Sequence, residues 1–81
     1  MKIPHDWLLV DGKKITRTFE FKGFIEAMAF VNKVAVLAEK ENHHPDINIQ
    51  WNKVTLTLTT HDAGGLTEKD LGMAEKIGDF I

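Results

Sequence analysis

Two hydrophobic periods follow one another in residues 15–38, which read ITRTFEFKGFIEAMAFVNKVAVLA. Up to Phe21 the side chains alternate between two faces, a pattern typical of a strand with one buried side. After Gly23, apolar residues recur every three or four positions without Gly or Pro, which predicts an amphipathic helix. Its expected buried stripe is Phe24, Ala27, Met28, Val31, Val34, Ala35 and Ala38. The helix should end near Glu41–Asn42, because Pro45 cannot continue it.

Further strands and a second helix flank this region. Asp11-Gly12 between two apolar runs predicts a hairpin that joins residues 7–10 to residues 15–21. Alternation over 47–51 and 54–58 predicts a second hairpin, with Asn52–Lys53 near its turn. A last helix should follow Thr67 as its cap, with Leu71, Ala74 and Ile77 on one side.

The order strand-strand-helix-strand-strand-helix predicts an α+β fold. We expect a four-stranded antiparallel sheet with both helices packed on one face, and a single domain over residues 1–81. A core this small favours self-association.

Composition excludes several classes of protein. The 81 residues contain no cysteine, which rules out a disulfide framework, an iron–sulfur cluster and a thiol nucleophile, and it favours a cytoplasmic location. No apolar run approaches the roughly 20 residues that span a bilayer. The formal net charge is −2 and the basic residues are scattered, so neither nucleic acid nor membrane is an expected partner.

Three of the four histidines should meet. His43 and His44 precede the third strand and His61 follows the fourth, so an antiparallel pairing brings them to one end of the sheet. Imidazole titrates near pH 6.5 and therefore transfers protons at neutral pH without much tuning. The sequence predicts a cleft suited to acid–base chemistry, while His5 near the terminus is set aside.

Two other interpretations of these histidines stay open. In the first, His43 only ends the helix, where its charge suits the dipole, and His61 is a polar strand end. In the second, the three histidines hold zinc with a water as fourth ligand. Adjacent histidines diverge, however, and no HExxH-like helical pair is present, so no metal is expected.

Other polar and aromatic residues also have plain structural interpretations. Trp51 is expected in the core, although an aromatic side chain near the rim could stack on a flat heterocycle. Asp70, three residues after Thr67, is explained by helix capping, and Glu39 by a solvated helix face. The alternating threonines of the fourth strand could form an uncovered sheet face or a surface against which another subunit packs.

An ordered set of motifs extends over almost the whole chain. It comprises Glu39-Lys-Glu-Asn-His43-His44-Pro45, Trp51, Thr59-Thr60-His61-Asp62, Gly64-Gly65-Leu66-Thr67 and Asp70, with flanking residues back through Phe21-Lys22-Gly23-Phe24 to Trp7. In order and spacing this set resembles the pterin-4a-carbinolamine dehydratase family. Asn42 stands where that family usually has an acidic or amide residue.

The resemblance implies an activity and a site. The family removes water from 4a-hydroxytetrahydropterin to give quinonoid dihydropterin, in recycling of the tetrahydrobiopterin used by aromatic amino acid hydroxylases. It implies no metal and no organic cofactor, and subunits that pair through the sheet into homodimers or homotetramers. The catalytic residues would be His43, His44 and His61. The same three histidines and Asn42, Thr59, Thr60 and Asp62 would bind the pterin, supported by Glu39, Pro45, Trp51 and Asp70.

Within this set, the hypothesis is that His43 and His61 exchange protons while His44 orients the ring; sequence alone leaves these roles interchangeable. Only six residues precede Trp7, where family members usually carry a further helical segment, so we expect an effect on assembly and stability more than on activity. The alternative function is a protein-interaction module, because some animal relatives also act as a dimerisation cofactor of a homeodomain transcription factor.

Overall fold

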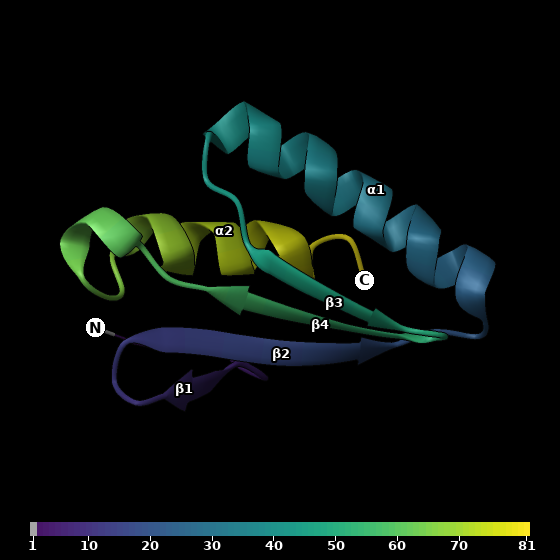
Figure 1. Ribbon diagram of the computed structural model, residues 1–81, viewed down its shortest axis with the longest axis horizontal. Helices are drawn as coiled ribbons and strands as arrows, with labels where there is room; N and C mark the ends of the chain where they lie inside the picture. The colour runs from purple at the N-terminus through teal and green to yellow at the C-terminus, as the bar shows by residue number, and fades with distance from the viewer. Residues whose placement is uncertain (1) are drawn as a thin grey trace.

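The computed structural model describes residues 2–81 and contains one sheet and two long helices (Figure 1). In spatial order the strands of the sheet are β1 Leu8–Val10, β2 Lys14–Glu20, β4 Lys53–Leu58 and β3 Asp46–Gln50, and every neighbouring pair is antiparallel. Both helices lie on the same side of it (Figure 1). The predicted α+β fold and its element order are confirmed. The helix α1, Phe24–Glu41, joins β2 to β3, and a 3₁₀ turn, His61–Ala63, and the helix α2, Glu68–Gly78, follow β4.

The core lies between the sheet and the helices. Phe19 of β2 is central to it, with its ring centroid 4.7 Å from that of Phe30 and 6.1 Å from that of Trp7. The guanidinium of Arg17 lies 4.4 Å from the Phe19 centroid, a cation–π contact that accounts for a cation on the buried face of a strand. The buried apolar residues are Trp7, Ile15, Phe19, Ala27, Phe30, Val34, Ala38, Val54, Leu56, Leu58, Leu71, Met73, Ala74 and Ile77.

The predicted stripe of α1 is partly wrong. Phe24 and Ala35 are exposed, whereas Phe30, which was not predicted, is buried. The helix meets the sheet along Ala27, Phe30, Val34 and Ala38. On a helix of about 3.6 residues per turn, positions 24 and 35 lie roughly a quarter turn from that line, so their spacing matched a helix but not its buried face.

The placement of Trp51 in the core is also wrong. Gln50 pairs with Lys53, which leaves Trp51 and Asn52 as a two-residue turn, and Trp51 is 69% exposed there with φ of 52°. The alternation of β3 therefore ends one residue earlier than expected. Asn52 is the buried member of the turn, and its amide donates to the carbonyl of Phe21 at 2.9 Å.

The sheet face that is turned away from the helices carries threonines in register. Thr18 hydrogen-bonds Thr55 at 2.8 Å, and Thr16 hydrogen-bonds Thr57 at 3.3 Å. These pairs satisfy one another, as cross-strand hydroxyls do in sheets.

The second helix begins where its sequence predicts. Thr67 is its cap, and Leu71, Ala74 and Ile77 are buried together with Met73. Near its end, Lys76 donates to the carboxylate of Glu41 at 2.8 Å, and this hydrogen bond lowers the pKa of Glu41 below its usual value. Among residues 2–81, no helix combines the length and apolarity needed to cross a membrane.

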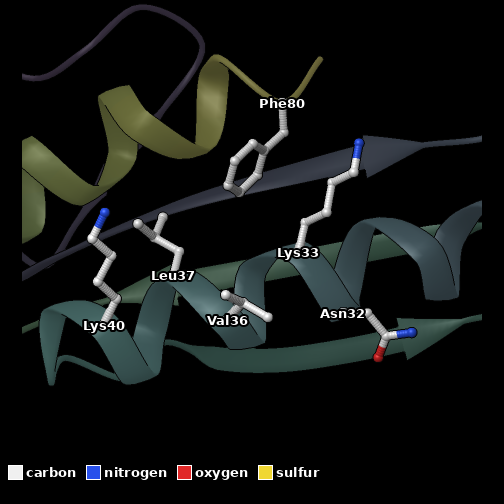
Figure 2. Close-up of a pocket in the computed structure, with 6 residues that line it drawn as sticks. All are labelled: Asn32, Lys33, Val36, Leu37, Lys40 and Phe80. Carbon is white, nitrogen blue, oxygen red and sulfur yellow. The ribbon is translucent and has the colours of Figure 1, made fainter.

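A groove of about 490 Å³ lies between α1 and the end of the chain (Figure 2). Figure 2 shows Phe80 and Leu37 on its walls and a lysine, Lys33 or Lys40, towards each end. Its lining residues include no histidine and no carboxylate, so it offers no group for proton transfer near neutral pH.

Leu56 provides a test of the core. Its side chain is fully buried on β4, so Leu56→Ala should lower the free energy of unfolding by about 2–5 kcal/mol through lost burial and a residual cavity. Urea denaturation measures this loss, and the matched control is Leu8→Ala, because Leu8 is 69% exposed. A smaller effect at position 56 than at position 8 would contradict the placement of β4 at the centre of the core.

Candidate active site

Eight residues surround one polar hollow of about 350 Å³ at one end of the sheet. Seven of them were predicted as site residues, and the structure brings them together from the loop after α1 and from the segment after β4. Lys69, in the first turn of α2, was not predicted. The lining residues are Asn42, His43, His44, Thr59, Thr60, His61, Asp62 and Lys69.

Strand register explains why these segments meet. Asp46, the first residue of β3, pairs with Thr57 near the end of β4, so the residues before β3 and after β4 leave the sheet at the same end. The β3–β4 turn lies at the other end of this hairpin, which is where the structure places Trp51. Trp51 therefore does not line the hollow, and an aromatic stacking platform from this residue is absent there.

The loop that carries the histidines begins with a left-handed residue. Asn42 follows α1 with φ of 52°, and its N–H donates to the carbonyl of Glu39. Asn adopts this conformation more readily than most residues, which accounts for its presence at the end of the helix. The N–H of His43 then donates to the carbonyl of Ala38 at 3.1 Å, so the backbone of the first histidine is tied to α1.

Backbone hydrogen bonds also hold the segment after β4. Thr60 and Gly65 exchange hydrogen bonds of 3.0 and 3.2 Å, which close a loop around the 3₁₀ turn His61–Ala63. Gly64 ends that turn with φ of 72°, a conformation that favours glycine. His61 thus lies on a closed loop and not on a free strand end.

Asp70 links the two segments. Its carboxylate is fully buried, and one oxygen, Oδ2, accepts hydrogen bonds from Thr60 Oγ1 at 2.7 Å and from the N–H of Thr67 at 2.9 Å. The other oxygen, Oδ1, lies 2.5 Å from Nε2 of His43. Asp70 is therefore both the partner of Thr67 in a capping box and the partner of a predicted catalytic histidine.

The hydrogen bonds around Asp70 determine which His43 nitrogen carries a proton. An ionised carboxylate only accepts, so Nε2–H of His43 is the donor to Oδ1. In neutral His43 the lone pair then lies on Nδ1, which is left to accept a proton. The His43 side chain is 12% exposed, so the pair is shielded from bulk water but open to the hollow.

The other two histidines have different surroundings. Nε2 of His44 lies 2.5 Å from Oε2 of Glu39, and both side chains are mostly exposed. The ring of His61 is exposed and has no hydrogen-bond partner within residues 2–81. The site therefore contains one histidine held by a buried carboxylate, one held by a surface carboxylate and one that is free to meet a ligand.

The threonines of the site have limited hydrogen-bonding capacity left. Thr59 Oγ1 donates to the carbonyl of Lys13 at 2.8 Å, and Thr60 Oγ1 donates to Asp70. Each hydroxyl has one proton, so towards a ligand both oxygens can only accept. Thr67 donates in turn to the hydroxyl of Thr60.

The remaining predicted residues lie around the hollow or far from it. Pro45 is half-buried in the loop after the histidine pair, and Glu39 contacts the site through His44. His5 is exposed and lies against Asp6. Within the described part of the chain, no three His, Asp or Glu side chains are grouped so that they could hold a metal ion.

Lys69 is the lining residue that the sequence analysis missed. Its N–H donates to Thr67 Oγ1 at 3.3 Å, as part of the cap of α2. The signal that could have identified it is its position next to Asp70 in a first helical turn that the cap fixes against the site.

The chain is similar to known proteins over most of its length. Residues 1–80 match the family described as pterin 4 alpha carbinolamine dehydratase. A protein of Thermomicrobium roseum whose name assigns it to pterin-4-alpha-carbinolamine dehydratase is 57% identical over 69 residues, which are 85% of this chain and 74% of its own. A protein of the same name in Picosynechococcus is 61% identical over the same shares of the two chains.

Two solved structures share the fold. A protein from Brucella melitensis described as transcriptional coactivator/pterin dehydratase has a TM-score of 0.87 at 43% identity, over 93% of this chain and 81% of its own. A pterin dehydratase-like protein described as a RuBisCO assembly factor in the alpha-carboxysome has a TM-score of 0.78 at 23% identity, over 93% and 88%. The second comparison concerns the fold alone. Together, the match over residues 1–80 and the relatives at more than half identity show that this chain belongs to the pterin 4 alpha carbinolamine dehydratase family.

Proposed function

We propose that the chain is a hydro-lyase that removes water from 4a-hydroxytetrahydropterins and that its histidines carry the protons. The observation that supports this most is the His43–Asp70 pair, which shares a hollow with the unpartnered ring of His61. The family and the names of the relatives support the activity. The product, a quinonoid dihydropterin, would return to the tetrahydropterin pool by reduction.

The reaction requires two proton transfers. The bond from carbon 4a to the hydroxyl oxygen breaks as that oxygen receives a proton and leaves as water. The proton on the neighbouring ring nitrogen is removed, and its electron pair forms the new double bond to carbon 4a. One protonated and one neutral imidazole are sufficient for this, with no redox change.

The surroundings of the histidines suggest which ring accepts the proton and which ring donates one. Neutral His43 has its Nδ1 lone pair available and Asp70 behind Nε2, so the carboxylate stabilises the imidazolium that forms when His43 takes the ring proton. His61 is solvent-exposed and suits the acid, because water can restore its proton after each turnover. His44, held by Glu39, would orient the ring.

Binding of the pterin would use the polar rim. The oxygens of Thr59 and Thr60 accept from the amino and ring N–H groups, and Asp62 accepts likewise, whereas Asn42 offers both a donor and an acceptor.

His61 tests the chemistry directly. If it donates the proton to the leaving oxygen, His61→Ala should lower the rate of dehydration by about 10²–10⁴-fold, the usual contribution of general acid–base catalysis. The readout is dehydration of a 4a-hydroxytetrahydropterin above its uncatalysed rate, with His5→Ala as the matched control. A loss under tenfold in a folded variant would remove His61 from the chemistry. No acceleration by the wild-type protein would contradict the enzyme and favour the protein-interaction role.

Asp70 tests the positioning of His43. Asp70→Asn replaces an acceptor by an amide that can present a donor to Nε2, so we expect the neutral ring to change tautomer and kcat to fall by at least about tenfold. The ¹⁵N chemical shifts of the His43 ring report the tautomer. Thr67→Ala serves as control, because it removes the cap at a cost of about 0.5–2 kcal/mol while Asp70 stays in place. Equal losses of kcat in the two variants, with unchanged His43 shifts in Asp70→Asn, would contradict this role.

We also propose that the chain forms a homodimer or homotetramer. β3 is an edge strand of the sheet, and its Ile47 and Ile49 share a face with the core residues of β4 yet remain 38% and 37% exposed. An unpaired edge with apolar neighbours favours association with another chain. Sedimentation equilibrium should give the mass of two or four chains; a single-chain mass at micromolar concentration would contradict this.

A further inference from the structure

A second hollow adjoins the proposed catalytic one. It has a volume of about 310 Å³, and it shares Thr59 and His61 with the catalytic hollow. A ligand that fills the first can therefore extend past His61 into the second. The lining residues of the second are Asp11, Lys13, Lys14, Thr59, His61, Gly64 and Gly65.

The turn between β1 and β2 supplies the far wall of this second hollow. The N–H of Lys13 donates to the carbonyl of Val10 at 3.1 Å, and its carbonyl accepts from Thr59 Oγ1 at 2.8 Å. The backbone that carries the lysines is thus fastened both to its own hairpin and to the catalytic segment. Its position relative to His61 is set by the fold.

The second hollow is basic. Two lysines face one aspartate, Asp11, and with His61 neutral the lining has a formal charge of +1. Neither Lys13 nor Lys14 forms an ion pair within residues 2–81. Both cations are therefore available to a ligand.

A third hollow that also adjoins the catalytic one has the opposite charge. It shares Thr60, Asp62 and Lys69 with the catalytic hollow and adds Glu68, so two carboxylates face one lysine. A ring substituent that leaves the catalytic hollow therefore meets either the basic lining with Lys13 and Lys14 or the acidic lining with Asp62 and Glu68.

We infer that the basic hollow, here called the lysine subsite, binds an anionic group on the side chain of the pterin. This inference rests on the proposed function, since it concerns the substituent of the same substrate. Ammonium groups bind phosphate and carboxylate oxygens through charge-assisted hydrogen bonds, whereas a hydroxylated side chain gains no comparable attraction. The preferred substrates are pterins with a phosphorylated or carboxylated side chain.

The size of the effect follows from the exposure of the two lysines. Each exposed ion pair changes affinity by up to about fivefold, so an anionic side chain should tighten binding by roughly five- to twentyfold at low salt. Screening should reduce this preference as the Debye length falls from about 30 Å at 0.01 M to about 8 Å at 0.15 M ionic strength.

Calorimetric titration of the full chain tests the inference without catalysis. The phosphate arm compares 7,8-dihydroneopterin with its triphosphate, and the carboxylate arm compares 7,8-dihydrofolate with its dimethyl ester. The variants are Lys13→Ala/Lys14→Ala, the charge-preserving Lys13→Arg/Lys14→Arg and, as control, Lys53→Ala, which removes an exposed lysine at the other end of β4. Asp11→Asn should increase the preference, and Asn tolerates the positive φ at that position.

We expect tighter binding of the charged member of at least one pair. The ratio of the two affinities should fall to about one in the double alanine variant and should persist in the arginine and Lys53 variants. The arm that shows it identifies phosphate or carboxylate. Equal affinity within both pairs, or a preference that survives the double alanine variant, overturns the lysine subsite while the proposed function stands. Binding of no pterin at all overturns both.

Discussion

The buried carboxylate of Asp70 is the interaction on which the site depends. Burial of a charge is costly unless hydrogen bonds replace its lost water, and this carboxylate has three protein partners: Thr60, the N–H of Thr67 and His43. These partners come from the segment after β4, the cap of α2 and the loop after α1. Formation of the helix cap and positioning of the histidine are therefore one structural event.

The sheet supports this interaction through register. A shift of one residue between β3 and β4 would turn the core side chains of a strand to the opposite face, so burial of Val54, Leu56 and Leu58 fixes the pairing. The same pairing sets the end of the sheet at which His43 and His61 emerge. In this small domain the hydrophobic core and the placement of His43 and His61 have a common cause, and β3 remains an edge strand with two partly exposed isoleucines.

Much of the fold and of the candidate site was predictable from the sequence, wherever the signal is local or periodic. The element order, the cap at Thr67 and the meeting of the histidines follow from periodicity, turn residues and antiparallel geometry. Trp51 was wrongly predicted as buried because alternation continues into a turn without any change in hydrophobicity. The capping role of Asp70 was predictable, but its contact with His43, 27 residues away, depends on how α2 packs and has no local signal. Lys69 was missed although its position next to Asp70, in the capped first turn of α2, could have identified it.

In the proposed function, the imidazoles of the adjacent His43 and His44 and of the more distant His61 act on one pterin ring. A crystal structure of the protein with a bound pterin would show whether they do. We expect the ring between the loop after α1 and the segment after β4, with the hydroxyl on carbon 4a within hydrogen-bonding reach of His61 and the neighbouring ring N–H within reach of His43. A pterin bound elsewhere, for example in the groove beside Phe80, or a ring that contacts neither histidine would contradict it.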